Sequence, residues 1–176
     1  GLDSCADAMV GVSVKVSKKA AKGGLNNAFF VVENAMSLSD DLASTTDEIF
    51  IHLPWGSLRD GIIKGDPRLL DSLVRVSKHN ASLDIYITYS SRYEESEMLS
   101  RGLPELSMSY LRGPLKESFR QAGIQVTEIS VMNNEALKGV HTKWAKKLAY
   151  GKARDFFHLH CRIQKQNSLY IAASSK

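Results

Sequence analysis

Short apolar runs, each about the length of one β-strand, recur along the chain and are separated by segments of helical pattern. The runs are residues 28–32, 48–53, 83–89, 124–130 and 155–163, and Gly1 to Asp3 read as the end of one more strand. Strands that alternate with helices predict an α/β fold with a twisted, mostly parallel sheet and helices on both faces. The last two runs flank a long excursion, which indicates an antiparallel strand at one edge.

The helical segments are expected at residues 4–19, 57–63, 67–80, 92–106 and 115–122, the fourth broken by Gly102 and Pro104. Pro67 opens the third at a favoured first-turn position. A chain of 176 residues is long enough for one domain with its own core, so we predict a single domain over residues 1–176. Residues 164–176 are expected to form a loosely held tail.

Basic residues are concentrated in the C-terminal part of the chain. Residues 138–176 hold nine Lys or Arg and one acid, Asp155, whereas residues 1–137 hold 14 bases and 18 acids. A clustered positive charge favours a polyanionic partner, although solvated lysines are the more common explanation of a single charge run.

Cysteine and hydropathy patterns exclude other classes of protein. Cys5 and Cys161 are too few for a disulfide framework and have no CxxC context, which favours free thiols in a reducing cytoplasm. No apolar run reaches the length of a membrane span. His158 and His160 could share one face of a strand as metal ligands, but a structural role is the more common one for such a pair.

Two tryptophans stand out by their surroundings. Trp55 follows Pro54 in a turn after a strand, and Trp144 lies among lysines in KWAKKLAYGKAR. Tryptophan is mostly a core residue, yet two indoles that reach one cleft could hold a nucleobase between them. Asp3, at a strand end, could bind ribose hydroxyls of a nucleotide or could simply cap the following helix.

Three segments, LPWGSL, TYSSRYEESEMLSRGLPELS and KWAKKLAYGKARDFF, occur in this order. Together they closely resemble the aminoglycoside-resistance methyltransferases that modify N1 of adenine 1408 in bacterial 16S rRNA. The resemblance extends from Gly1 to about Cys161. It implies a class I fold that depends on S-adenosylmethionine, and it favours the interpretation of the two tryptophans as a base clamp.

The family's functional residues can be carried over to this sequence by position. The base-stacking tryptophans correspond to Trp55 and Trp144, and the acid that supports the flipped base corresponds to Glu94. The resemblance implies RNA contacts by a helical insertion at residues 90–114, a basic loop at residues 134–153 and a basic patch near the N-terminus. The implied RNA-binding residues are Lys15, Lys18, Lys19, Lys22, Arg101, Lys147, Lys152 and Arg154. Lys147 and Lys152 stand where the family has arginine, and lysine lacks the planar bidentate fork.

For the cofactor, the resemblance implies that Asp3 binds the ribose and that Ser57 and Thr142 lie beside the methionine end. The position of the family's acid near the cofactor adenine is occupied by Met36, for which Glu33 or Asn34 could substitute. A strand and glycine-rich loop that the family carries before Gly1 are absent here. We therefore expect a fragment that, alone, binds S-adenosylmethionine poorly.

The resemblance implies methylation of 16S rRNA in the 30S subunit by a cytoplasmic, monomeric enzyme that needs no metal. Two alternatives remain. The chain could be an inactive RNA-binding remnant of the family, whose binding weakens with salt. It could instead be a class I methyltransferase for a small molecule, whose binding does not depend on the lysines at 143–152.

Overall fold

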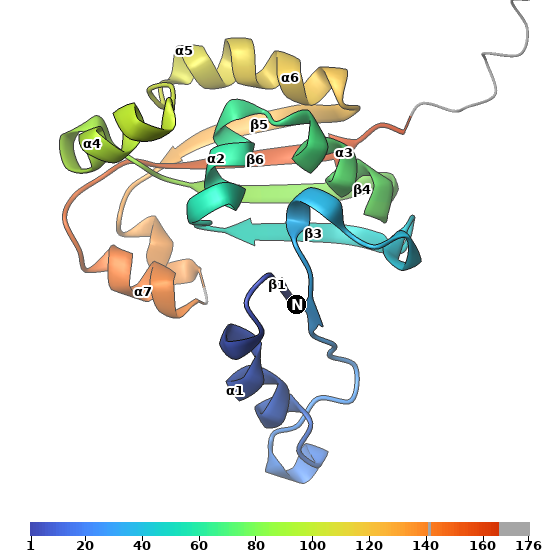
Figure 1. Ribbon diagram of the computed structural model, residues 1–176. Coiled ribbons are helices and arrows are strands. Elements are labelled where there is room, and N and C mark those ends of the chain that lie inside the picture. The colour runs from blue at the N-terminus through green and yellow to red at the C-terminus, as the bar shows by residue number, and fades with distance from the viewer. Residues whose placement is uncertain (141, 166–176) are drawn as a thin grey trace, which may run out of the picture.

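The computed structural model of the chain describes residues 1–140 and 142–165, except for the side chains of Lys143 and Trp144. Its main body is a four-stranded sheet in the order β3, β4, β6, β5 (Figure 1). The strands are β3 (Thr46–His52), β4 (Ser77–Ile87), β5 (Ile124–Met132) and β6 (Phe156–Ile163). β3 pairs with β4 in parallel, and β6 pairs with both β4 and β5 in antiparallel orientation. The sheet is therefore mixed, as the sequence predicts, but the antiparallel strand lies between β4 and β5 instead of at the edge.

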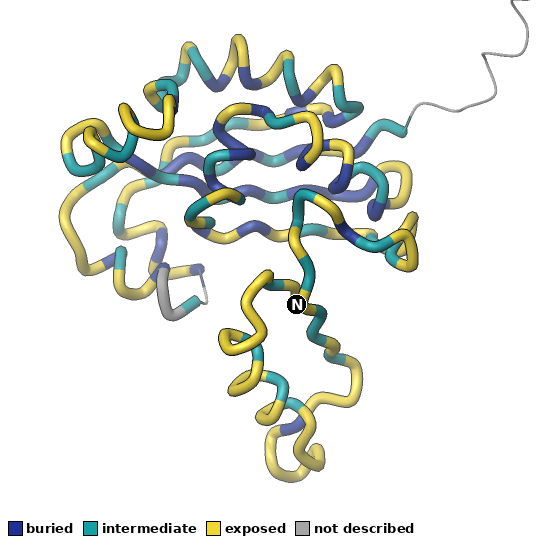
Figure 2. Tube along the Cα trace, viewed as in Figure 1, coloured by how far each residue is buried: buried dark blue, intermediate teal, exposed yellow. Residues whose placement is uncertain are grey.

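The main core lies between this sheet and one layer of helices. α2 (Gly56–Lys64), α3 (Pro67–Val76) and α6 (Lys116–Gln121) pack against inward-facing strand residues such as Leu83, Ile85 and Leu159, all fully buried. Figure 2 shows this buried layer, and α4 (Ser91–Arg101), which has no buried residue, lies at one end of it. Each of α2, α3 and α6 packs its apolar stripe on an apolar face of the sheet. The alternation of strand and helix patterns along the sequence predicts this arrangement.

Two element boundaries differ from the sequence-based expectation. α3 ends at Val76, and β4 begins at Ser77 although its apolar pattern starts only at Leu83. Ser77 donates its hydroxyl to the carbonyl of Leu73, and Asn80 adopts a left-handed conformation where the register of β3 against β4 shifts. A polar stretch with an irregular register carries no period-2 signal, so the sequence pattern extends the helix too far.

The sequence pattern also misses a helical segment. α5 (Met108–Tyr110) and a π-helical turn (Leu111–Leu115) continue directly into α6, although the expected helix begins only at Leu115. Proline interrupts the regular α-helical hydrogen bonds, and the wider π turn accommodates it. The fully buried Leu111 and Leu115 hold this turn against the core.

The opposite face of the sheet is covered at one end by a second, smaller layer. A 3₁₀ turn (Ala136–Gly139) and α7 (Lys143–Ala149) pack on Leu53 and Phe156 in a separate apolar cluster. The long connection between the last two strands, expected to be a basic loop, thus contains a short helix.

The first 34 residues form a small unit beside the main body, here called the N-terminal unit. β1 (Leu2–Asp3) pairs in parallel with β2 (Val31–Val32), and α1 (Ala6–Val16) and a 3₁₀ turn (Ala20–Lys22) lie between them. Only the last two residues of the predicted run 28–32 are strand. Two further 3₁₀ turns (Ala35–Ser37 and Asp40–Leu42) lead into β3. Within the described residues this two-stranded sheet is not hydrogen-bonded to the four-stranded one, and α1 buries no residue.

The two cysteines are both free thiols, as predicted, and differ in environment. Burial in the core raises the pKa of the Cys161 thiol to about 12, whereas Cys5 is exposed before α1. In the folded protein at pH 8 we expect a disulfide reagent such as Ellman's to titrate one thiol rapidly and the second only after unfolding. A Cys5→Ser variant should show no rapid reaction; rapid reaction of that variant would contradict the burial of Cys161.

Among the helices of the described residues, none is both long and apolar enough to cross a membrane.

Candidate functional site

A large groove lies between the N-terminal unit and the edge strand β3. It has a volume of about 1150 Å³, slightly above the range of about 300–1,000 Å³ typical of small-molecule sites. All the residues predicted to bind the cofactor line this groove, together with one of the two tryptophans: Asp3, Met36, Ser57, Thr142 and Trp55. Residues from four separate parts of the chain thus converge on one concave surface.

The polar groups of this groove are positioned by the ends of helices. Asp3 is the last residue of β1, and its Oδ1 accepts a hydrogen bond of 2.8 Å from the backbone N–H of Cys5, just before α1. Thr142 is the N-cap of α7, and its Oγ1 accepts from the backbone N–H of Ala145. Each side chain has this local role, and each also faces the groove.

Met36, predicted to lie near the adenine of the cofactor, contributes an apolar side chain to the groove. Met36 lies in a 3₁₀ turn and packs against the main core. Glu33 accepts a hydrogen bond of 2.8 Å from the backbone N–H of Ser39, and Asn34 caps the turn that contains Met36. Both line the groove, but each is already used in local structure.

Trp55 stands at the start of α2, where the chain turns sharply out of β3. Leu53 and Gly56 adopt left-handed backbone conformations on either side of it, with φ of 51° and 58°. The turn leaves Trp55 52% exposed, which is unusual for so large an apolar side chain. The guanidinium of Arg59, one helical turn further on, lies 5.3 Å from the centre of the indole.

Glu94 is held at a kink in α4, where its backbone is not helical (φ −127°, ψ 27°). Its Oε2 accepts a hydrogen bond of 2.7 Å from the backbone N–H of Ser90, and its Oε1 forms a 2.9 Å ion pair with Arg154. Both side chains of this pair are less than 15% exposed. Arg154 is one of the predicted RNA-binding residues, so the structure joins it directly to the proposed base-supporting acid.

Tyr93 links the same helix to the basic segment before β6. The charged groups of Arg92, Lys152 and Arg154 lie 5.7, 5.1 and 5.3 Å from the centre of its ring. Its hydroxyl donates to the carbonyl oxygen of Ala153. Cations at these distances are attracted by an aromatic face, so Tyr93 orders the cations that precede β6.

A small cavity of about 10 Å³ lies between Trp55 and the ion pair of Glu94 and Arg154. Its lining includes Trp55 and Arg59 from one side and Glu94 and Arg154 from the other. A volume of this size holds about one water molecule. Trp55 and Glu94, which are 39 positions apart in the sequence, therefore border one site.

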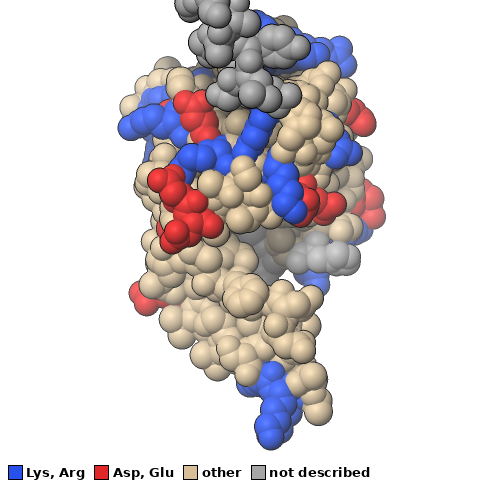
Figure 3. Space-filling model, turned by 90° about the vertical axis from the view of Figure 1, so that its right-hand side faces the viewer, with Lys and Arg blue, Asp and Glu red and all other residues tan. Residues whose placement is uncertain are grey.

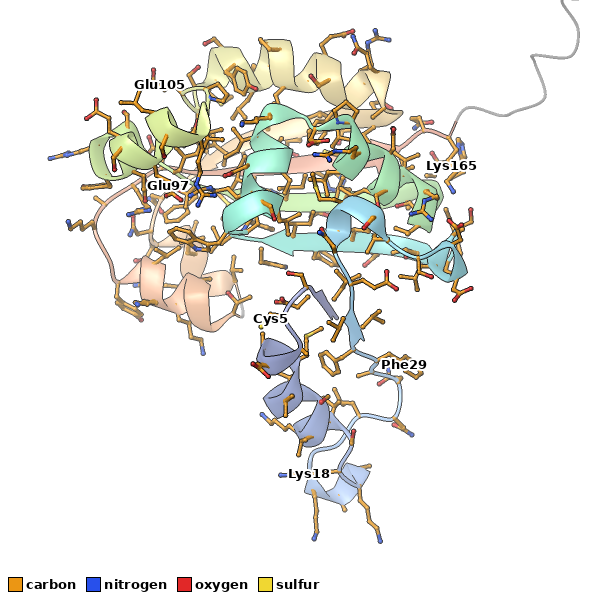
Figure 4. The ribbon with its side chains drawn as sticks, viewed as in Figure 1. Cys5, Lys18, Phe29, Glu97, Glu105 and Lys165 are labelled. Carbon is orange, nitrogen blue, oxygen red and sulfur yellow. The ribbon has the colours of Figure 1, made fainter. Side chains whose placement is uncertain are left out.

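Other predicted RNA-binding residues are distributed around this site. Lys15, Lys18, Lys19 and Lys22 are all exposed, at the far end of α1 and in the turn that follows it. Figure 3 shows basic side chains at this tip, and Lys18 is labelled there in Figure 4. Lys147 lies on the exposed part of α7. The backbone of Trp144 belongs to the same helix, but its side chain lies outside the described part of the structure.

Arg101, also predicted to contact RNA, is engaged within the protein. It pairs with Asp60 at 2.9 Å and with Glu97 at 3.3 Å, and the carbonyl of Arg101 accepts from Lys64. These contacts tie the end of α4 to α2. The side chain remains 41% exposed.

The histidine pair has a structural partner. His158 Nε2 and His160 Nδ1 lie 2.8 and 2.9 Å from the same oxygen of Asp84. His158 also stacks on Tyr86, with ring centres 4.3 Å apart. Among the described residues there is no cluster of three or more His, Cys, Asp or Glu side chains suited to a metal ion.

Arg59, Tyr93 and Asp84 are functional or structural residues that the sequence alone does not single out. Arg59 is four residues after Trp55 on a predicted helix, and this spacing could have indicated a contact. The roles of Tyr93 and Asp84 depend on partners more than 50 residues away, which no local pattern shows.

The ion pair of Glu94 and Arg154 gives a prediction for stability. We expect Glu94→Gln to lower the free energy of unfolding by about 1–3 kcal/mol, because a charged hydrogen bond in a largely buried place is removed. Denaturation in urea measures the change. Glu95→Gln is the matched control, because Glu95 is exposed on the same helix; equal losses of stability in the two variants would contradict the role of the pair.

Comparison with known proteins identifies the family of the chain. A family model described as NpmA, 16S rRNA (adenine(1408)-N(1))-methyltransferase, matches residues 1–163. A curated protein with that description from Escherichia coli is 36% identical over 166 residues, which span 94% of this chain and 76% of the relative. A second, from Streptoalloteichus hindustanus, is 28% identical over 89% of this chain and 70% of its own length.

Solved structures show the same fold. A variant of the 16S rRNA (adenine(1408)-N(1))-methyltransferase from Catenulisporales acidiphilia, crystallised with the cosubstrate SAM, superimposes with a TM-score of 0.82 at 26% identity. That match covers 95% of this chain and 75% of the other. The aminoglycoside-resistance methyltransferase NpmB1 superimposes with a TM-score of 0.77 at 28% identity, over 93% of this chain and 74% of the other. With its family model matched from Gly1 to Ile163 and its fold shared with these enzymes, the chain belongs to the 16S rRNA (adenine(1408)-N(1))-methyltransferase family.

Proposed function

We propose that this chain takes part in methylating N1 of adenine 1408 of 16S rRNA in the 30S subunit, with S-adenosylmethionine as cosubstrate. The observation that carries the proposal is the convergence of Asp3, Met36, Ser57, Thr142 and Trp55 on one groove, next to the pair of Glu94 and Arg154. We propose further that the protein acts as a monomer in the cytoplasm and confers resistance to aminoglycosides.

The residues of the groove fit the proposed cosubstrate. A carboxylate at a strand end, as in Asp3, suits ribose hydroxyls, and the Met36 side chain offers an apolar wall to a purine. The hydroxyls of Ser57 and Thr142 belong to residues that line the same groove, and they can donate to the amino-acid end. When bound, S-adenosylmethionine would supply the sulfonium methyl that passes in line to N1.

The protein's part in this reaction is to position the base. N1 of adenine carries a neutral lone pair at physiological pH, so no general base is needed to make it a nucleophile. The flipped base needs an aromatic platform, a role that we assign to Trp55 and Trp144. Glu94, fixed by Ser90 and Arg154, supports the flipped conformation, and the exposed lysines bind phosphates.

The proposal is tested with purified 30S subunits and tritiated S-adenosylmethionine. We expect label in 16S rRNA and a reverse-transcription stop at adenine 1408, because a methyl group on N1 blocks Watson–Crick pairing. Subunits that carry guanine at position 1408 are the control and should remain unlabelled at that site.

The two alternatives give different results in the same assay. Binding to 30S subunits that weakens with salt, without methyl transfer, would identify an RNA-binding protein that is not an enzyme. The absence of both binding and transfer to 30S subunits would leave the small-molecule methyltransferase as the better explanation.

A further inference from the structure

The side chain of Arg59 is almost completely buried although arginine is rarely found in such places. It is 3% exposed, and it lies directly beside Trp55, which is 52% exposed. Buried arginines require partners for their charge and for their donors. The positions of those partners indicate what this residue does.

The edge of the guanidinium is occupied by two carboxylates. Nη2 of Arg59 lies 3.0 Å from Glu97 Oε1 on α4 and 3.2 Å from Asp60 Oδ1 on its own helix, and Nε donates to the same oxygen of Asp60 at 3.3 Å. Glu97, labelled in Figure 4, lies in the C-terminal half of α4. These contacts fix the plane of the guanidinium.

The guanidinium also lies over two aromatic rings. Its central carbon lies 5.3 Å from the centre of the Trp55 ring and 6.0 Å from the centre of the Tyr89 ring. Tyr89 is 4% exposed and belongs to the main core. The chain of contacts therefore runs from the rigid core through Tyr89 and Arg59 to the exposed indole.

We propose that Arg59 is a positioning residue that orients the indole of Trp55, holding the ring against its guanidinium so that the exposed part is presented to the base. The functional half of this inference rests on the proposed role of Trp55 in stacking. Arginine suits the task because its planar cation stacks on aromatic faces while its edge stays hydrogen-bonded. A lysine retains the charge but neither the plane nor the bidentate edge.

The orientation can be measured without methyl transfer. The chain has two tryptophans, so a Trp144→Phe background leaves Trp55 as the single tryptophan, whose fluorescence is excited apart from that of the tyrosines. In this background we expect Arg59→Met to increase the fraction of the indole in other orientations about two- to thirtyfold. This change in population corresponds to the loss of the free energy of one cation–π contact. The readouts are the fast component of the fluorescence anisotropy decay and acrylamide quenching.

Three variants separate ring contact from a general structural role. Glu97→Gln removes the ion pair between Arg59 and Glu97 but leaves the contacts of Arg59 with Asp60 and with the indole, so Trp55 should stay ordered. Arg59→Lys should give an intermediate result and also serves if Arg59→Met does not fold. Arg68→Met removes an arginine whose side chain is 77% exposed and should change neither readout.

The outcomes decide the inference. Equal anisotropy decays for Arg59→Met and Arg68→Met would overturn it, and so would a drop in order for Glu97→Gln that matches the drop for Arg59→Met. In the protein that retains Trp144 we expect Arg59→Met to lower kcat for 30S methylation with KM nearly unchanged. If Trp55→Ala methylates normally, the base clamp fails while the anisotropy result still stands, so the two failures are distinguishable.

Discussion

Replacing Trp55 by alanine should reduce kcat for methylation of 30S subunits about 10- to 100-fold while their binding changes little. Stacking on one aromatic side chain contributes about 1–3 kcal/mol per base, and this contribution is made only once the base has left its helix. Docking of the subunit depends instead on phosphate contacts by the lysines. The measurements are initial rates with tritiated cosubstrate and filter binding of labelled 30S subunits.

Trp55→Phe is the matched variant, because it retains an aromatic face and should keep most of the rate. Since Trp55 is 52% exposed, its removal should lower the melting temperature only slightly, which thermal denaturation checks. A wild-type rate for Trp55→Ala would remove the basis for the clamp. If binding and rate fell by the same factor, Trp55 would instead contribute to docking of the 30S subunit.

Replacing Lys15, Lys18, Lys19 and Lys22 together by alanine should weaken 30S binding by orders of magnitude at low salt. Removing one lysine–phosphate ion pair reduces the slope of log K against log salt concentration by about 0.7–0.9, so removing four reduces it by about 3. Affinity measured between 50 and 200 mM salt tests both the size and the slope of the effect, at concentrations where such ion pairs are known to matter.

The control for net charge replaces four exposed bases elsewhere on the surface, namely Arg68, Arg112, Lys116 and Arg120. It removes the same charge, so long-range attraction falls equally, but the local contacts at the tip of the N-terminal unit remain. If both quadruple variants show the same fall in affinity and slope, the four tip lysines act only through net charge and do not contact phosphate.

The sequence predicts the fold well where its periodicity is strong. The apolar face of α3, with Leu69, Leu70 and Leu73, is fully determined by local pattern, and so are the inward residues of β4 from Leu83 onward. Prediction fails where polar or helix-breaking residues are held by distant contacts. The polar start of β4 is fixed by its pairing with β3, and Pro114 remains in a helix because Leu111 and Leu115 are buried.

The candidate site divides in the same way. Motif resemblance selects Trp55, Glu94 and Arg154, because each lies in a segment with a distinctive order of residues. It does not show that Glu94 and Arg154 form one ion pair, or that Arg59 lies beneath Trp55, since these contacts depend on how α2, α4 and the segment before β6 meet in space. Arg101 illustrates the limit, because a residue selected for RNA contact is also an internal clamp between two helices.

The position of β6 in the sheet has a consequence for how the protein is made. This strand comes last among the described elements, yet it lies between β4 and β5 and pairs with both. During synthesis β4 and β5 leave the ribosome before β6, the strand that pairs with both of them. Until residues 156–163 emerge, the facing edges of β4 and β5 have no hydrogen-bonding partner, and their apolar faces lack the neighbouring residues of β6. The nascent chain therefore cannot complete its sheet until nearly all of the described residues have emerged. A polypeptide whose synthesis ends before Phe156 would lack β6 and would be prone to aggregation.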